Sequence, residues 1–170
     1  MSEYWDLYDE KRMPLGRTHK RGHPMEEGTY HQVVAIWAVD ADGKLLITLR
    51  DQSKELYPGL WESTSGSAQS GESSVEAAQR ELVEETGLYV PLEEITFLGS
   101  AQKAASFVDI FIVFLDEREP KVTLQQGETT AYRWLRLTEL DQLIADGLFA
   151  FPLTYHFSYF RPLIEARWPQ

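Results

Sequence analysis

Three glutamates, Glu81, Glu84 and Glu85, are spaced so that their carboxylates can act together. Residues three and four apart share one face of an α-helix, so a helix here would bring these side chains together. Hard divalent cations prefer carboxylate and carbonyl oxygens, and Mg²⁺ commonly bridges protein carboxylates to substrate phosphates. Arg80 lies one turn before Glu84 and can hold a carboxylate in place. The alternative is an ordinary acidic helix face exposed to water.

The residues around these glutamates predict a glycine-rich loop that runs into a helix. Ser73 is a favourable N-cap, and Glu76 three residues later completes a capping box. Gly87 can adopt the left-handed conformation that ends a helix. Three apolar residues recur at helical spacing and are predicted to face a core: Val75, Ala78 and Leu82.

Apolar runs and turn residues predict the elements that position this helix. Strands are predicted at residues 5–8, 16–18, 32–39, 44–50, 95–101, 109–115 and 131–135, the first two as a hairpin. Residues 57–61 are predicted to be a turn, which leads through residues 62–64 into the glycine-rich loop. Further helices are predicted at 138–145, with Thr138 as the N-cap, and at 155–167. This pattern predicts a mixed α/β domain.

The segment from Gly66 to Leu88 resembles the signature of the Nudix hydrolases. That signature is glycine, five residues, glutamate, seven residues, arginine and glutamate, an aliphatic residue, any residue, two glutamates, any residue, glycine and an aliphatic residue. Every specified position is filled, by Gly66, Glu72, Arg80, Glu81, Leu82, Glu84, Glu85, Gly87 and Leu88. At residue frequencies of roughly 6 % for each invariant position, a chain of this size would match by chance about once in a million. The resemblance implies an α/β/α sandwich with a mixed β-sheet, in which this Nudix box forms a loop–helix–loop.

The resemblance also implies an activity, the metal-dependent hydrolysis of a diphosphate linked to another group. It implies a site for Mg²⁺ or Mn²⁺ formed by the carboxylates of Glu81, Glu84 and Glu85 and a main-chain carbonyl at Ser65 or Gly66. Arg80 is expected to orient the glutamates, and Glu72 is expected to brace the loop rather than to bind metal. The general base is left open between a box glutamate and a carboxylate from a distant loop.

Candidate residues outside the box complete this hypothesis. Glu128, just before a predicted strand, fits a distal metal ligand or base, with a plain loop acid as the alternative. Arg50 and Lys54 are candidates for contacts to substrate phosphates, and Tyr57 is a candidate for lining a substrate pocket. The sequence also has one basic cluster, which either meets a phosphate or forms a solvated loop: His19, Lys20, Arg21 and His23.

The segment before the box resembles one branch of the superfamily, the isopentenyl-diphosphate isomerases. The matching residues are His31, Asp42, Gly43, Lys44, Leu45, Leu46, Arg50 and the run Tyr57, Pro58, Gly59, Leu60 and Trp61, and His23 and His31 also match two histidine ligands of the isomerases. The isomerases place a catalytic cysteine where this chain has Ser65, a metal-binding histidine at Ser67 and a catalytic glutamate near Asp109. A serine hydroxyl is a far weaker acid than a thiol and does not replace it unaided, so a hydrolase is favoured. A non-catalytic nucleotide-binding module is the other alternative, and it is disfavoured because such modules usually lose a box glutamate.

Length and composition limit the remaining possibilities. The 170 residues predict a single domain spanning 1–170, and the chain has no cysteine. A net charge of −11 argues against a nucleic-acid polymer as partner. No apolar stretch reaches the length of a membrane span, and the first residues do not resemble a signal peptide, which predicts a cytoplasmic protein. The expected partner is a small-molecule diphosphate substrate, and a homodimer, common in the family, is left open.

Overall fold

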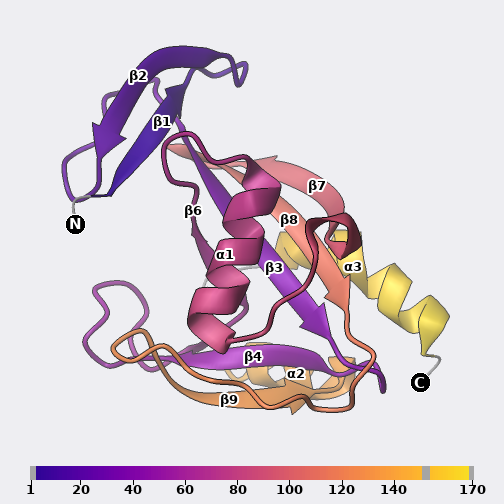
Figure 1. Cartoon of the computed structure of the whole chain (residues 1–170). Helices are drawn as coiled ribbons and strands as arrows, with labels where there is room; N and C mark the ends of the chain where they lie inside the picture. Colours follow the sequence, from indigo (N-terminus) through magenta and orange to yellow (C-terminus); the bar gives the residue numbers. More distant parts are fainter. Residues whose placement is uncertain (1–2, 151–153, 169–170) are drawn as a thin grey trace.

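The computed structural model describes residues 3–150 and 154–168 and contains one mixed sheet flanked by helices (Figure 1). The elements in chain order are β1 (Tyr4–Tyr8), β2 (Pro14–Lys20), β3 (His31–Val39), β4 (Leu45–Arg50), β5 (Trp61–Glu62), β6 (Thr64–Ser67), α1 (Ser74–Thr86), a 3₁₀ turn (Leu92–Glu94), β7 (Thr96–Gln102), β8 (Ser106–Phe114), β9 (Thr129–Leu135), α2 (Leu137–Ala145) and α3 (Thr154–Arg167). The strand order is β5-β4-β3-β8-β7, with β6 also paired to β3 and β9 to β4. Strands β3 and β8 run parallel, while the other strand pairs are antiparallel.

The sheet is covered on both faces, which explains the continuous apolar runs of β3 and β8. Alternate residues of β3, such as Val34 and Ile36, pack with Leu82 of α1. The residues between them, such as Trp37, pack with Phe160 of α3 and with α2. Figure 1 shows α1 on one face of the sheet and α2 and α3 on the other. The predicted α/β/α sandwich is therefore confirmed.

The caps predicted for α1 are present. The Glu76 N–H donates to Ser73 Oγ over 3.4 Å, and the Ser73 N–H donates to Glu76 Oε2 over 2.9 Å. Gly87 ends the helix at φ 72°, where its N–H donates to the Val83 carbonyl over 2.8 Å. These caps fix where the helix begins and ends, and they therefore set which way its glutamates point.

The predicted hairpin is also present, as β1 and β2, which pair only with each other in the strand ladder. It projects from one end of the main sheet (Figure 1). Arg12, in its turn, reaches the sheet: its guanidinium is 2.5 Å from Asp109 Oδ2, 2.6 Å from Gln32 Oε1 and 3.1 Å from Ser100 Oγ. Because Asp109 is 2 % exposed, this ion pair anchors the hairpin turn to the middle of β8.

Three predictions about the elements are wrong. Thr138 is not the N-cap of α2: the cap is Arg136, whose N–H donates to Glu139 Oε2 over 2.8 Å. Strand β8 begins at Ser106 rather than at 109, because it pairs with β3 along its whole length. The turn predicted at 57–61 and the connection predicted at 62–64 instead contain β5 and the start of β6, two short strands held by β4 and β3. Among the described residues, no helix is long and apolar enough to cross a membrane.

Candidate active site

The site lies where Gly66 of β6 packs beside α1. Gly66 pairs with Val34 of β3, and this row of the sheet faces the helix. A Cβ at Gly66 would lie 2.1 Å from the carboxylate of Glu81. Only glycine therefore lets the Glu81 carboxylate rest against the strand, which is the physical reason for the first glycine of the signature.

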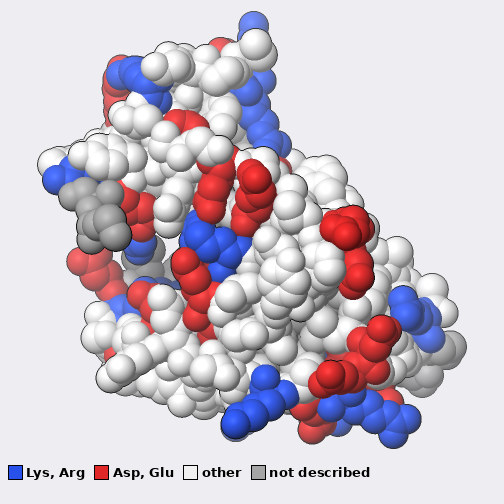
Figure 2. Space-filling view, in the orientation of Figure 1, with Lys and Arg blue, Asp and Glu red and all other residues white. Residues whose placement is uncertain are grey.

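Arg80 connects the box loop to the acidic face of the helix. Its Nε and Nη2 bind the two carboxylate oxygens of Glu72 over 2.7 and 3.0 Å. Its Nη1 donates to Glu81 Oε1 over 2.8 Å and to Glu84 Oε2 over 3.1 Å, and its Nη2 donates to the Ser67 carbonyl over 3.0 Å. All five N–H groups of the guanidinium therefore have an acceptor. In Figure 2, basic and acidic side chains lie next to one another over α1.

Glu72 lies at the loop end of this network. Besides its two bonds to Arg80, it accepts a hydrogen bond from the Gln69 N–H over 2.8 Å. Glu72 therefore ties the loop to the helix, and this contact is consistent with the bracing role expected from the sequence.

Glu85 is the most deeply buried carboxylate of the box, at 7 % exposure, and its Oε2 has no hydrogen-bond partner. Burial raises its pKa well above the usual value, and the charges of Glu62 and Glu81 raise it further. Burial also raises the pKa of Glu81 to about 7, against the opposing effect of Arg80. Glu84 differs, since its side chain is 45 % exposed. An ionised carboxylate is costly to bury without a compensating cation or donor.

Glu62 joins this cluster, although the sequence did not single it out. It lies on β5, is 3 % exposed and accepts a hydrogen bond from Arg50 Nη1 over 2.6 Å. Burial raises its pKa to about 7, while Arg50 acts in the opposite direction. The only sequence signal was an acidic residue directly after the apolar pair Leu60 and Trp61, and a two-residue strand is too short to reveal periodicity.

The candidates outside the box lie in different surroundings. Glu128 forms an ion pair with Lys54, and its charge raises the pKa of both Glu62 and Glu85, after burial as the main cause. The structure therefore brings Glu128 to the carboxylate cluster. Arg50 is held by Glu62 and by the Leu56 carbonyl, which Nε contacts over 2.9 Å.

Tyr57 lies in the loop between β4 and β5, with a φ of 52° and 41 % of its surface exposed. This exposure rules out the alternative of a core aromatic, and the predicted contact with a substrate stays a prediction.

The donor set fits a hard divalent cation, but it is not arranged around one. Within the described residues, no group of three or more histidine, aspartate or glutamate side chains has the geometry to hold a metal ion. Arg80 engages oxygens of Glu81 and Glu84 instead. The unpartnered Glu85 Oε2 and the close approach of Glu81 to Gly66 are the features that a Mg²⁺ or Mn²⁺ ion would satisfy.

Comparison with known proteins identifies the family. A family model described as the NUDIX domain matches residues 29–157. The chain belongs to the Nudix family. An uncharacterized Nudix hydrolase of Listeria monocytogenes is 35 % identical over 148 residues, which cover 86 % of this chain and 88 % of the relative. An isopentenyl-diphosphate isomerase of Photorhabdus laumondii is 31 % identical over 151 residues, covering 85 % and 83 %.

Solved Nudix structures share the fold. The structure of DR0079 from Deinococcus radiodurans has a TM-score of 0.73 at 24 % identity and covers 87 % of this chain and 92 % of its own. The NUDIX domain of NrtR from Shewanella oneidensis, solved in complex with ADP ribose, has a TM-score of 0.60 at 17 % identity and covers 90 % and 94 %.

Two of the residues compared with the isomerase branch of the Nudix family, His31 and Asp109, contact the hairpin. His31 is stacked on Trp5 with ring centroids 4.1 Å apart, and burial lowers its pKa to about 4. His23 is exposed, and its carbonyl lies 3.1 Å from His19 Nε2. Asp109, in the region of the isomerase glutamate, is bound by Arg12. These contacts give Asp109 a part in anchoring the hairpin.

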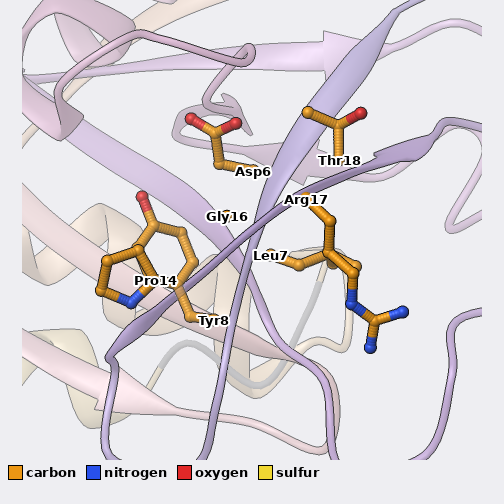
Figure 3. Close-up of a pocket in the computed structure, with 7 residues that line it drawn as sticks. All are labelled: Asp6, Leu7, Tyr8, Pro14, Gly16, Arg17 and Thr18. Carbon is orange, nitrogen blue, oxygen red and sulfur yellow. The ribbon is translucent and has the colours of Figure 1, made fainter.

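A hollow of about 340 Å³ lies in the hairpin itself, away from the Nudix glutamates (Figure 3). Its lining residues are Asp6, Leu7, Tyr8, Pro14, Gly16, Arg17 and Thr18. Figure 3 shows the side chains of Asp6 and Arg17 pointing away from each other. The Asp6 carboxylate is engaged with the box loop, accepting from Ser70 Oγ over 2.6 Å and from the Gly71 N–H over 2.9 Å.

Proposed function

We propose that this protein is a metal-dependent hydrolase of a diphosphate linkage in a nucleotide or a related small molecule. The observation that carries the proposal is the buried Glu85 carboxylate, whose Oε2 has no partner although Glu62 and Glu81 lie close by. Such a group is stabilised by a bound cation, and diphosphate substrates arrive with divalent cations. The complete Nudix box around it supports the same conclusion.

The proposed roles follow from the contacts of each residue. Glu81, Glu84, Glu85 and the Gly66 carbonyl would hold Mg²⁺ or Mn²⁺. When bound, such an ion neutralises charge on the phosphoryl oxygens and lowers the pKa of a coordinated water. Arg80 orients Glu81 and Glu84 through hydrogen bonds from Nη1 and keeps the box loop in place through Glu72.

The proposed proton acceptor is Glu128, which approaches the cluster from outside the box. Its ion pair with Lys54 joins the residue directly before β9 to the loop after β4. We propose that Lys54 and Arg50 contact substrate phosphates and that Tyr57 contacts the remainder of the substrate. The relative solved with ADP ribose makes nucleoside diphosphate derivatives the first substrates to test.

Phosphate release tests this proposal directly. The full chain would be assayed with Mg²⁺ and with Mn²⁺ against nucleoside di- and triphosphates, ADP-ribose, nucleotide sugars and isopentenyl diphosphate, with the products identified. Metal-dependent cleavage of one class is expected. Isomerised isopentenyl diphosphate without cleavage would instead support the isomerase alternative, against which the absence of cysteine and the Arg12–Asp109 pair already weigh.

The double variant Glu84→Gln/Glu85→Gln tests the assignment of the box. We expect hydrolysis to fall by about 10³-fold or more, because two charged oxygen ligands are lost while the shape of each side chain is kept. The matched control is Glu93→Gln/Glu94→Gln, an adjacent pair of exposed glutamates in the 3₁₀ turn. Wild-type turnover by the Glu84/Glu85 variant would refute the metal assignment.

A further inference from the structure

The hairpin lies outside the matched Nudix domain, yet its first strand is fastened to the box loop. The family match begins at residue 29, whereas the hairpin ends with the last residue of β2, Lys20. The Ser70 N–H donates to the Tyr4 carbonyl over 2.8 Å, and the Asp6 carboxylate accepts from Ser70 Oγ and from the Gly71 N–H. The open end of the hairpin is therefore held against the loop that leads into α1.

Arg21 lies at this open end, and Glu3 fixes its position. Arg21 Nη1 is 2.6 Å from Glu3 Oε2, and the Arg21 N–H donates to the Glu3 carbonyl over 3.0 Å. The other carboxylate oxygen of Glu3 accepts from Trp5 Nε1 over 2.8 Å, and Trp5 is stacked on His31 at the start of β3. The sheet thus positions Arg21 through a short chain of contacts.

The end of the hairpin that carries Arg21 is fastened to the box loop beside α1. The pKa of Arg21 is raised first by the hydrogen bond to Glu3, and the charges of Glu128 and Glu81 act in the same direction. Glu128 lies directly before β9, and Glu81 lies on α1. In Figure 1 the open end of the hairpin, near the N terminus, and the loop after β4 lie on the same side of α1.

The Arg21 guanidinium is also more accessible to a phosphate than those of Arg80 and Arg50. Every N–H of Arg80 is engaged by the box, and the Arg50 side chain is only 11 % exposed under Glu62. The Arg21 side chain is 59 % exposed and its ion pair is with one carboxylate. Exposed ion pairs are weak, so a multiply charged phosphate can replace Glu3 at little cost. A protein with a net charge of −11 needs such local cations to accept a diphosphate.

We propose that Arg21 is a phosphate-binding residue of this site, and that the hairpin forms a wall of the substrate cleft. The proposal rests on the proposed function, since it deepens the description of the same site. When substrate binds, a phosphate oxygen replaces the Glu3 carboxylate as the partner of the Arg21 guanidinium. Glu3 keeps its hydrogen bond from Trp5 Nε1.

Binding of inorganic pyrophosphate, measured by calorimetry with Mg²⁺ present, tests the proposal without turnover. We expect Arg21→Ala to weaken pyrophosphate binding about fivefold to tenfold, the loss of one partly exposed charge-assisted hydrogen bond. The matched control is Arg17→Ala, because Arg17 lies on the same hairpin, is 51 % exposed and forms a 2.6 Å ion pair with Glu26. This control should bind pyrophosphate as the wild type does.

Glu3→Gln separates recognition from structure. If Arg21 binds phosphate, this variant should bind pyrophosphate at least as tightly as the wild type, because it releases the guanidinium. Weaker binding by Glu3→Gln would mean that the ion pair is structural and would overturn the proposal. Equal binding by Arg21→Ala and the wild type would overturn it too, and would leave the proposed hydrolase standing. A wild type that binds no pyrophosphate with Mg²⁺ would overturn both.

Discussion

The chemistry of this protein depends on carboxylates that are buried before any cation binds. Burial is the main cause that raises the pKa of Glu62, Glu81 and Glu85, and the charges of Glu62 and Glu81 raise the pKa of Glu85 further. Each unit by which folding raises a carboxyl pKa costs about 1.4 kcal/mol of stability once the group is ionised. The site therefore stores repulsion that a bound cation can relieve.

This arrangement predicts an inverse pH dependence of stability without metal. Glu62 and Glu81 have folded pKa values raised to about 7, above the unfolded value of 4.5. Between these values these two groups bind more protons in the folded state, so their contribution to stability falls as pH rises from about 4.5 to about 7. The lowered pKa values of the buried His31 and His156 act in the opposite direction up to about pH 6.5 and reduce the slope. Carboxylates with lowered pKa values, such as Glu76, change stability below this window.

Thermal unfolding in EDTA at several pH values between 5 and 8 measures this slope. We expect the melting temperature to fall with pH in the wild type and to fall less in Glu62→Gln, which cannot ionise. Glu93→Gln, an exposed glutamate, should keep the wild-type slope. A wild-type melting temperature that rises steadily across this range would contradict the burial of these carboxylates.

The sequence predicted that the candidate residues of one helix lie together and named Glu128 and Arg50 from outside that helix, but it missed Glu62. Arg80, Glu81, Glu84 and Glu85 were predictable because helical spacing alone brings them together. The burial of Glu62 depends on the pairing of β5 with β4. Its partner Arg50 lies 12 positions away in the sequence. Such a partner leaves no local pattern in the sequence.

At the scale of elements, the contact between the hairpin and the box loop joins a segment outside the matched Nudix domain to the Nudix box. Asp6 provides two of the three hydrogen bonds that join them. The loop they hold also supplies the Ser67 carbonyl and Glu72 to Arg80. A shift of the loop would therefore displace Arg80 and, through its hydrogen bonds, Glu81 and Glu84.

Asp6→Asn tests this connection. An amide cannot accept at both positions, so one hydrogen bond is lost, and we expect a stability loss of about 1 kcal/mol. We also expect kcat for the hydrolysed substrate to fall about tenfold, because small displacements of catalytic groups lower the rate. Asp9→Asn is the control, since Asp9 Oδ1 accepts from the Lys11 and Met13 N–H groups within the hairpin turn. A normal kcat in Asp6→Asn would show that the loop holds its position unaided.

The elements themselves divide into those with local signals and those without. The helix α1 was predicted because Ser73, Glu76 and Gly87 mark its ends. Strand β5 was missed because two residues are too few to show periodicity, and β6 was missed because its serine, threonine and glycine residues show no alternation with apolar residues. Both strands form by pairing, β5 with β4 and β6 with β3. The N-cap of α2 was misplaced by two residues, an ordinary uncertainty at a helix end.

At the scale of the whole molecule, the site lies at the margin between the α1 layer and the sheet. The two core clusters on the faces of the sheet hold these layers, and the acidic side chains collect where α1, β5 and the start of β9 meet. The net charge of −11 adds a general repulsion to this local one. A divalent cation therefore acts on the stability of the whole fold as well as on the chemistry.

Mg²⁺ is accordingly expected to stabilise the protein specifically. A ligand at 100 times its Kd adds about 2.7 kcal/mol of stability, which for a domain of this size raises the melting temperature by about 5 to 10 °C. The shift should be larger at pH 8 than at pH 5, because protons compete for the same carboxylates. NaCl at matched ionic strength separates this effect from general screening of the net charge. Glu84→Gln/Glu85→Gln should lose most of the shift and Glu93→Gln/Glu94→Gln should keep it, since both pairs remove the same charge. An equal shift in the two variants would place the cation outside the Nudix box.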